Sequence, residues 1–275
     1  NGENLPMLLN HNMKLSQKKS EILAVARRFD AVYGQAAQES IGTIKSQLIE
    51  AKEKLEMSSS QYHEIMEREG YPMQPSEDAM ELVGQQAEYY YDTHILEEQL
   101  LSLVEMKVVS LFKNFEIVQK ELISISYEQV NTRDLYLWDN VKAFFNSKGI
   151  HYGRIKGYDF VNHLRIVNNN IKHSSLIDAE TQKMKIKEFQ ELESFTYQSL
   201  DSFYNRIFKK IGEFLVALAE SIVENLYDYD EQRLNEIVDE YAETMNVDTL
   251  KKLAKLLDGK AKKLSKGSKL PRHWL

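Results

Sequence analysis

The sequence contains no cysteine among its 275 residues. This absence excludes disulfide bonds, thiolate catalysis and the zinc or iron–sulfur sites that depend on cysteine ligands, and it fits a reducing compartment. The histidines are also spaced without a paired metal-binding pattern such as His-Glu-x-x-His. We therefore expect a protein without a metal site and without another cofactor.

Proline and glycine are scarce, with four and eleven residues respectively. An all-β protein turns often and needs more of both residue types at its turns. The hydrophobic fraction of 43% and the charged fraction of 28% are typical of a globular protein with a buried core. The composition therefore favours a helical globular fold.

Long hydrophobic runs are missing as well. The most apolar stretch, residues 211–223, is interrupted by glycine, glutamate and serine, whereas a membrane-spanning helix needs roughly 20 consecutive apolar residues. The first residues lack the basic and apolar parts of a signal peptide. We expect a cytoplasmic protein without a membrane partner.

The net charge of −7 is unevenly distributed. Residues 251–275 contain nine lysines and arginines against one acid, and the rest of the chain contains 26 bases against 41 acids. Such a basic segment is more often a solvated chain end; the alternative is salt-dependent binding of phosphates without sequence preference.

Helical periodicity dominates the chain. The clearest interruption is residues 70–76, where two prolines end any helix. We predict an all-α helical bundle with long antiparallel helices. Its expected parts are an N-terminal helical extension over residues 1–75, the bundle over 76–250 and a basic tail over 251–275. Helices are expected over residues 15–33, 36–69, 79–129, 135–146, 158–173, 178–226 and 230–254.

One predicted helix, residues 158–173, has a polar face that suggests chemistry. At about 100° per residue, Phe160, Leu164, Val167 and Ile171 fall within about 60° of one another and form a buried stripe. Arg165, Asn169 and His173 then lie at about 140°, 180° and 220° from Phe160, opposite that stripe. We expect this row to face solvent, a cleft or a partner subunit.

These residue types suit the cleavage of an RNA phosphodiester. An imidazole moves a proton to or from the ribose 2′-hydroxyl or the leaving oxygen near neutral pH. A guanidinium holds the phosphate and stabilises charge in the transition state, and an amide orients the imidazole or binds the phosphate. We therefore predict Arg165, Asn169 and His173 as catalytic residues, and Lys172 and Asn168 as ligands of phosphate.

The pattern Leu164-Arg165, Asn169 and Ile171-Lys172-His173, behind an aromatic helix and a Gly-Ile loop, resembles HEPN domains. The resemblance covers about residues 80–227. It implies an all-α fold and a metal-independent ribonuclease of a bacterial toxin–antitoxin or antiphage-defence system. It further implies a homodimer, in which an Arg and a His from each protomer meet, with RNA as substrate and an antitoxin or another defence protein as partner.

The spacing departs from that family. Seven residues separate Arg165 from His173, where the family's motif has four to six. Either Arg165 acts from one turn further back, or the chain is a non-catalytic interaction or scaffold module. A third interpretation is an ordinary solvated helix face with a cationic end. Asn168, Asn169 and Asn170 are poor helix formers, so a helix here requires tertiary contacts.

Overall fold

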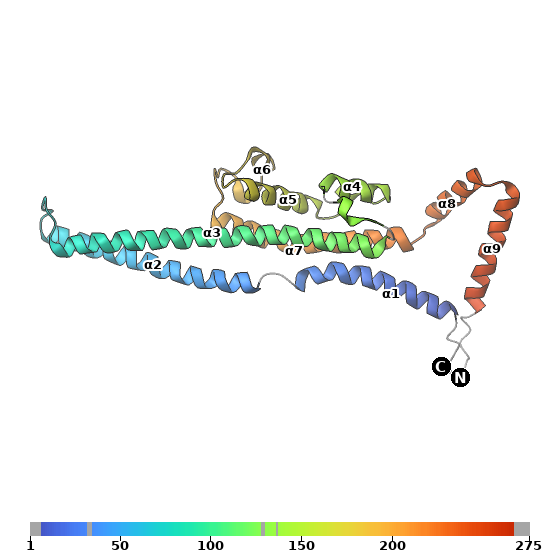
Figure 1. Ribbon diagram of the computed structural model, residues 1–275, viewed down its shortest axis with the longest axis horizontal. Coiled ribbons are helices and arrows are strands. Elements are labelled where there is room, and N and C mark those ends of the chain that lie inside the picture. The colour runs from blue at the N-terminus through green and yellow to red at the C-terminus, as the bar shows by residue number, and fades with distance from the viewer. Residues whose placement is uncertain (1–6, 32–34, 128–129, 136, 267–275) are drawn as a thin grey trace, which may run out of the picture. The chain divides into compact units, whose positions relative to one another are not determined.

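The computed structural model describes residues 7–31, 35–127, 130–135 and 137–266, and within them it confirms an all-α helical bundle. Parts of three predicted segments lie outside these ranges. They are residues 1–6 of the N-terminal extension, Tyr136 of the aromatic helix and residues 267–275 of the basic tail. Figure 1 shows the order of the helices along the chain. They are α1 (Met7–Arg27), α2 (Gln35–Arg68), α3 (Glu77–Ser126), α4 (Trp138–Ser147), α5 (Tyr158–His173), α6 (Ala179–Lys183), α7 (Tyr197–Tyr227), α8 (Glu231–Thr244) and α9 (Val247–Lys266).

The chain forms two compact units, each assembled from segments that are far apart in the sequence. One unit comprises residues 1–29, 117–158 and 212–275, and the other comprises 30–116 and 159–211. Both α3 and α7 contribute residues to both units. This interleaved organisation differs from the contiguous parts that we expected from sequence.

The second unit contains a helical hairpin made of α2 and the first part of α3 (Figure 1). Gly70 takes a positive φ of 70° at the end of α2, a conformation that glycine adopts without steric cost. The Ser76 hydroxyl then accepts a hydrogen bond from the Ala79 N–H at the start of α3. An ion pair of 2.7 Å joins Lys52 to Glu97 across the hairpin. The antiparallel arrangement predicted from the two prolines is thus present.

The core of the second unit also contains the segment that follows α5. Phe189 lies 5.1 Å, between ring centroids, from both Phe195 and Phe203. The buried Lys107 of α3 forms a 3.1 Å ion pair with Asp201 of α7. A buried lysine requires such a partner because an isolated charge is costly to remove from water.

The first unit is organised around Tyr152, whose side chain is fully buried. Its ring contacts those of Trp138, Phe145, Tyr158 and Phe214 at centroid distances of 5.3–5.9 Å. The Gln119 side-chain amide donates a hydrogen bond to the Tyr152 hydroxyl. Burial raises the pKa of Tyr152 far above its usual value, so the phenol remains neutral.

Two predicted helices are interrupted in the structure. The helix expected over residues 178–226 breaks after α6, and residues 184–196 cross to α7 with only a short 3-10 helix, η4 (Lys187–Phe189). Lys185 and Glu191 take positive φ values of 50° and 65° there. The sequence does not indicate this turn, because neither position is glycine or asparagine, the residues that most often adopt a positive φ.

The helix expected over residues 230–254 divides into α8 and α9. Met245 is extended, and the Asn246 side chain accepts a hydrogen bond of 2.9 Å from the Thr249 N–H, which caps the new helix. Helix α9 then continues to Lys266, so most of the predicted basic tail is helical. Leucine and lysine, which are both good helix formers, account for this continuation.

Candidate functional site

Helix α5 spans Tyr158–His173, the same residues that the sequence predicted. Gly157, with a φ of 92°, precedes it and allows the chain to turn into the helix. Asp159 lies in its first turn, and Lys172 and His173 lie in its last. Both placements favour the helix because its amino end carries partial positive charge and its carboxyl end partial negative charge.

The core-facing side of α5 is broader than predicted. Leu164 and Val167 are completely buried as expected, whereas Phe160 and Ile171 are only half-buried. Val161 is completely buried, although it lies about 100° from Phe160. Helix α5 therefore packs on the core over more than half of its circumference, and only a narrow strip remains exposed.

That strip carries the predicted polar row. Asn169, Lys172 and His173 are exposed, and Arg165 is half-buried. All four lie between about 120° and 220° from Phe160, on one face of the helix. The structure thus places Arg165, Asn169 and His173 together with Lys172 on the side away from the core. Three basic side chains therefore line a single helical face.

Arg165 is held by neighbouring polar groups. Its Nε donates to Asn162 Oδ1 at 3.2 Å, and its Nη2 lies 3.4 Å from Glu180 Oε1 of α6. The Glu180 side chain is 60% exposed, whereas that of Arg165 is 22% exposed. A phosphate that binds this guanidinium must displace Glu180, whose own side chain is exposed enough to move away.

Asn168 is not part of the exposed strip. Its side chain is 0% exposed, and its Nδ2 donates to Asn169 Oδ1 at 3.2 Å. At about 80° from Phe160 it lies within the broad buried arc, which explains its position. A phosphate therefore has no access to Asn168 in this structure, contrary to its predicted role.

Asn170 supplies the tertiary contacts that the asparagine run requires. It is 2% exposed, and its Nδ2 donates to the Leu176 carbonyl at 2.8 Å. Its Oδ1 accepts from the Asp178 N–H at 2.9 Å and from the Thr181 hydroxyl at 3.0 Å. Asn170 therefore fastens the loop after His173 and the helix α6, which bears Glu180, to α5.

Replacing Asn170 with Ala should lower the free energy of unfolding by about 2–3 kcal/mol, because the buried Thr181 hydroxyl loses its acceptor. Chemical denaturation followed by circular dichroism measures the change. The exposed Ser175 in the same loop provides the control, and its replacement by Ala should change stability by less than about 0.5 kcal/mol. Equal losses in the two variants would show that Asn170 does not anchor the loop.

A second polar cluster surrounds His163, on the flank of α5. Arg206 of α7 forms a two-pronged ion pair with Glu188, with distances of 2.6 and 2.8 Å, and its guanidinium lies 5.8 Å from the Phe160 ring centroid. Burial, and then the charge of Arg206, lowers the pKa of His163, so the imidazole is neutral at pH 7. This cluster fixes η4 on α7 and was not predicted from the sequence.

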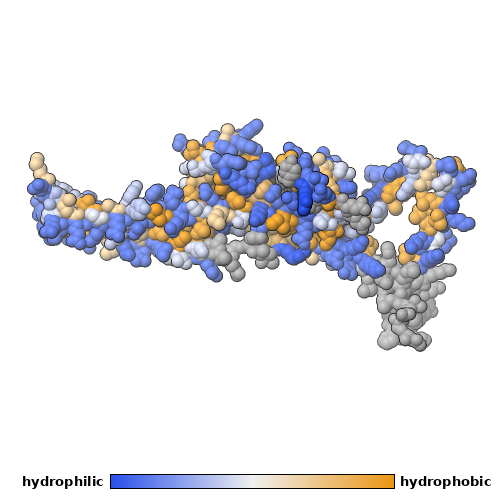
Figure 2. All heavy atoms as spheres, in the orientation of Figure 1, coloured by the Kyte–Doolittle hydropathy of each residue, from blue (hydrophilic) through white to orange (hydrophobic). Residues whose placement is uncertain are grey.

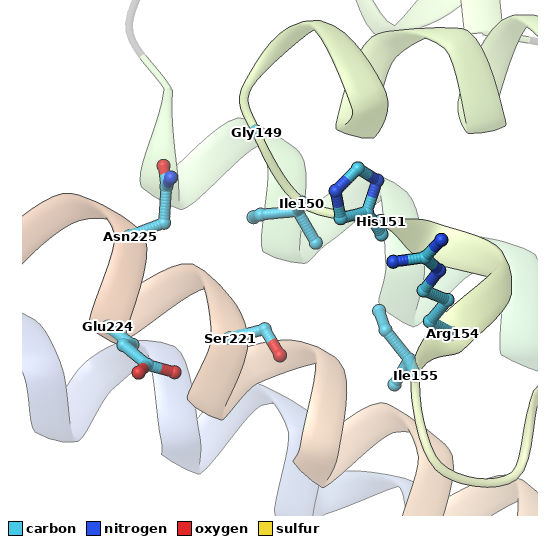
Figure 3. Close-up of a pocket in the computed structure, with 8 residues that line it drawn as sticks. All are labelled: Gly149, Ile150, His151, Arg154, Ile155, Ser221, Glu224 and Asn225. Carbon is cyan, nitrogen blue, oxygen red and sulfur yellow. The ribbon is translucent and has the colours of Figure 1, made fainter.

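A surface pocket of about 330 Å³ was also missed by sequence reasoning. It is lined by Gly149, Ile150, His151, Arg154, Ile155, Ser221, Glu224 and Asn225. In Figure 3 the His151 and Arg154 side chains lie next to each other above helix α7. The pocket contains an imidazole and a guanidinium, the same two groups that α5 presents. Variants of His151 therefore serve as controls for variants of the α5 residues.

Within the part of the chain that the structure describes, no three His, Asp or Glu side chains gather closely enough to hold a metal ion. No described helix combines the length and the apolar character needed to cross a bilayer. The comparison with known proteins gives no family model, no curated protein and no solved structure that matches this chain. The resemblance to HEPN domains therefore stays a prediction.

Proposed function

We propose that the protein is a metal-independent RNA endonuclease that acts as a homodimer in a bacterial toxin–antitoxin or antiphage-defence system. The observation that carries this proposal is the exposed face of α5, where Arg165, Asn169, Lys172 and His173 line up without competing apolar side chains. If the protein belongs to a toxin–antitoxin system, its expected partner is an antitoxin protein.

The spacing within the row supports a site made from two protomers. Arg165 and His173 are two helical turns apart, about 12 Å along the axis, so they are poorly placed to act on one phosphate from one chain. Asn169 lies midway between them. If two copies of α5 cross antiparallel with a two-fold axis near Asn169, Arg165 of one copy lies opposite His173 of the other. The dimer then contains two such composite pairs.

The chemistry assigned to this pairing is transesterification. One imidazole removes the proton of the ribose 2′-hydroxyl, and the 2′-oxygen attacks the phosphorus. The bond between phosphorus and the 5′-oxygen breaks, and the leaving oxygen takes a proton from water because each composite pair contains a single imidazole; the products are a 2′,3′-cyclic phosphate and a 5′-hydroxyl. Arg165 stabilises the charge on the phosphoryl oxygens, and Lys172 attracts the RNA backbone.

The test is incubation of the full chain with single-stranded RNA in the presence of EDTA. We expect fragments to accumulate, because no step of the assigned chemistry requires a metal ion. Intact RNA in the presence of a folded protein, verified by circular dichroism, would refute the proposal.

A second candidate function is a non-catalytic scaffold or interaction module. It is favoured by the large apolar side chains exposed on the α2–α3 hairpin, among which Met57, Met80 and Tyr90 are 62%, 57% and 69% exposed. Under this alternative, replacing Tyr90 with Asp removes a bound partner, while replacing His173 with Ala leaves that partner bound.

A further inference from the structure

Helix α8 presents an apolar face that no described residue of the chain buries. Leu234, Ile237, Val238 and Tyr241 lie within about 100° of one another around the helix. Leu234 is 50% exposed, Val238 is 57% exposed and Tyr241 is 41% exposed, and α8 contains no buried residue. An amphipathic helix of this kind gains little stability until its apolar face is covered.

Helix α9 presents an apolar face that is only partly covered. Val247, Leu250, Leu253, Leu257 and Leu264 share one side of the helix. Helix α9 contacts both α1 and α8, yet Val247 remains 67% exposed and Leu257 remains 60% exposed. Figure 2 shows hydrophobic residues at the surface of the α8–α9 segment.

The two helices have opposite charges. Helix α8 contains five acids and one base, whereas α9 contains seven lysines and two aspartates. A groove beside α8 is lined in part by the acids Glu224, Asp228, Asp230, Glu236 and Glu240. An acidic amphipathic helix with an acidic groove is therefore complementary to a basic amphipathic helix, and this chain contains one of each.

We propose that two copies of this chain associate through these helices, with α8 of each copy packing against α9 of the other. The four helices then form an antiparallel bundle in which the apolar faces are buried and the charges of opposite sign lie at the edges. The arrangement is self-complementary, as a two-fold interface requires, because each acidic helix meets a basic one. This inference holds whether or not α5 cleaves RNA.

Pairing between α8 and α9 of the same copy does not satisfy these faces. Only Met245 and Asn246 connect the two helices, and α8 remains without a buried residue although it contacts α9. An anionic membrane fits less well than a second copy, because it attracts the lysines of α9 but repels the acids of α8. A second copy of the chain is the partner that accounts for both helices.

The test exchanges the charges at the edges of the two apolar faces. One variant carries Lys251→Glu, Lys260→Glu and Lys262→Glu on α9, and the other carries Glu231→Lys and Glu240→Lys on α8. All five positions are exposed, so both variants should retain the helical content of the native chain. Both variants, and the chain with native α8 and α9, also carry Asn169→Arg, which places two arginines on the two-fold axis proposed for α5 and so removes that second route to a dimer. Light scattering measures the mass, which for the chain with native α8 and α9 should be twice the 32.1 kDa of one copy.

Each variant alone should be monomeric at micromolar concentration, with a dimer Kd at least about tenfold higher, because like charges then face each other. An equimolar mixture should recover the dimeric mass, since α8 of each variant now matches α9 of the other. A monomeric mass for the chain with native α8 and α9, or variants whose mass stays dimeric, would overturn the inference. A mixture that fails to recover the dimer while the native chain binds phosphatidylserine vesicles would also overturn it, and would assign α9 to membranes.

Discussion

Replacing His173 with Ala should lower the rate of RNA cleavage at least about 100-fold, the effect usual for loss of a general acid or base. The imidazole lies on the exposed strip of α5, where it is free to approach the 2′-hydroxyl. Because His173 is exposed in the last helical turn, its loss should leave the folding free energy nearly unchanged. Single-turnover cleavage of a labelled RNA, together with a denaturation curve, separates the two effects.

His151 is the matched control for this experiment, since it is also exposed but lies in the pocket beside α7. The His151→Ala variant should cleave RNA at the native rate. If instead His151→Ala abolishes cleavage and His173→Ala does not, the active site is the pocket of Figure 3 and the assignment to α5 is wrong.

Replacing Arg206 with Met should lower the free energy of unfolding by about 3–5 kcal/mol. The Glu188 side chain is only 6% exposed, so loss of Arg206 leaves a buried carboxylate without its main partner. The flexible methionine retains contact with the Phe203 ring, against which the guanidinium now lies, so little of the loss comes from packing. Urea denaturation at neutral pH measures the change.

Two features make this prediction specific. Lys187, whose side chain is 71% exposed and lies 3.8 Å from Glu188, is the control, and Lys187→Met should cost less than about 1 kcal/mol. Burial by itself raises the pKa of Glu188, but hydrogen bonding and the charge of Arg206 outweigh burial, so the pKa is lowered. The native protein should therefore lose this stability as the pH falls below about 4.5 through the lowered pKa, whereas the Arg206→Met variant should not. Equal stability of the two Met variants at pH 7 would contradict the account.

The helices were predictable where local signals agree. The bounds of helix α5 were predicted correctly because its apolar period is clear. The break between α2 and α3 was predicted from the two prolines in residues 70–76. The break between α6 and α7 was missed because Lys185 and Glu191 take left-handed conformations that tertiary contacts impose.

The candidate site was predictable only in part. Helical periodicity placed Arg165, Asn169 and His173 on the outer face, and a poor helix former such as Asn170 indicated tertiary contacts. Helical periodicity did not reveal that Asn168 is buried, because the width of the buried arc depends on which elements pack around α5. Short sequence patterns could not predict the cluster of His163, Glu188 and Arg206 or the two-unit organisation, because both bring together segments that are far apart in the sequence.

The 3′ ends of RNA fragments produced in EDTA test the central claim most directly. If the exposed face of α5 acts by attack of the 2′-hydroxyl, the fragments must end in 2′,3′-cyclic phosphate and begin with a 5′-hydroxyl, which mass spectrometry distinguishes. Fragments with 3′-hydroxyl ends and 5′-phosphates would mean that water is the nucleophile, and they would contradict the mechanism proposed for Arg165 and His173.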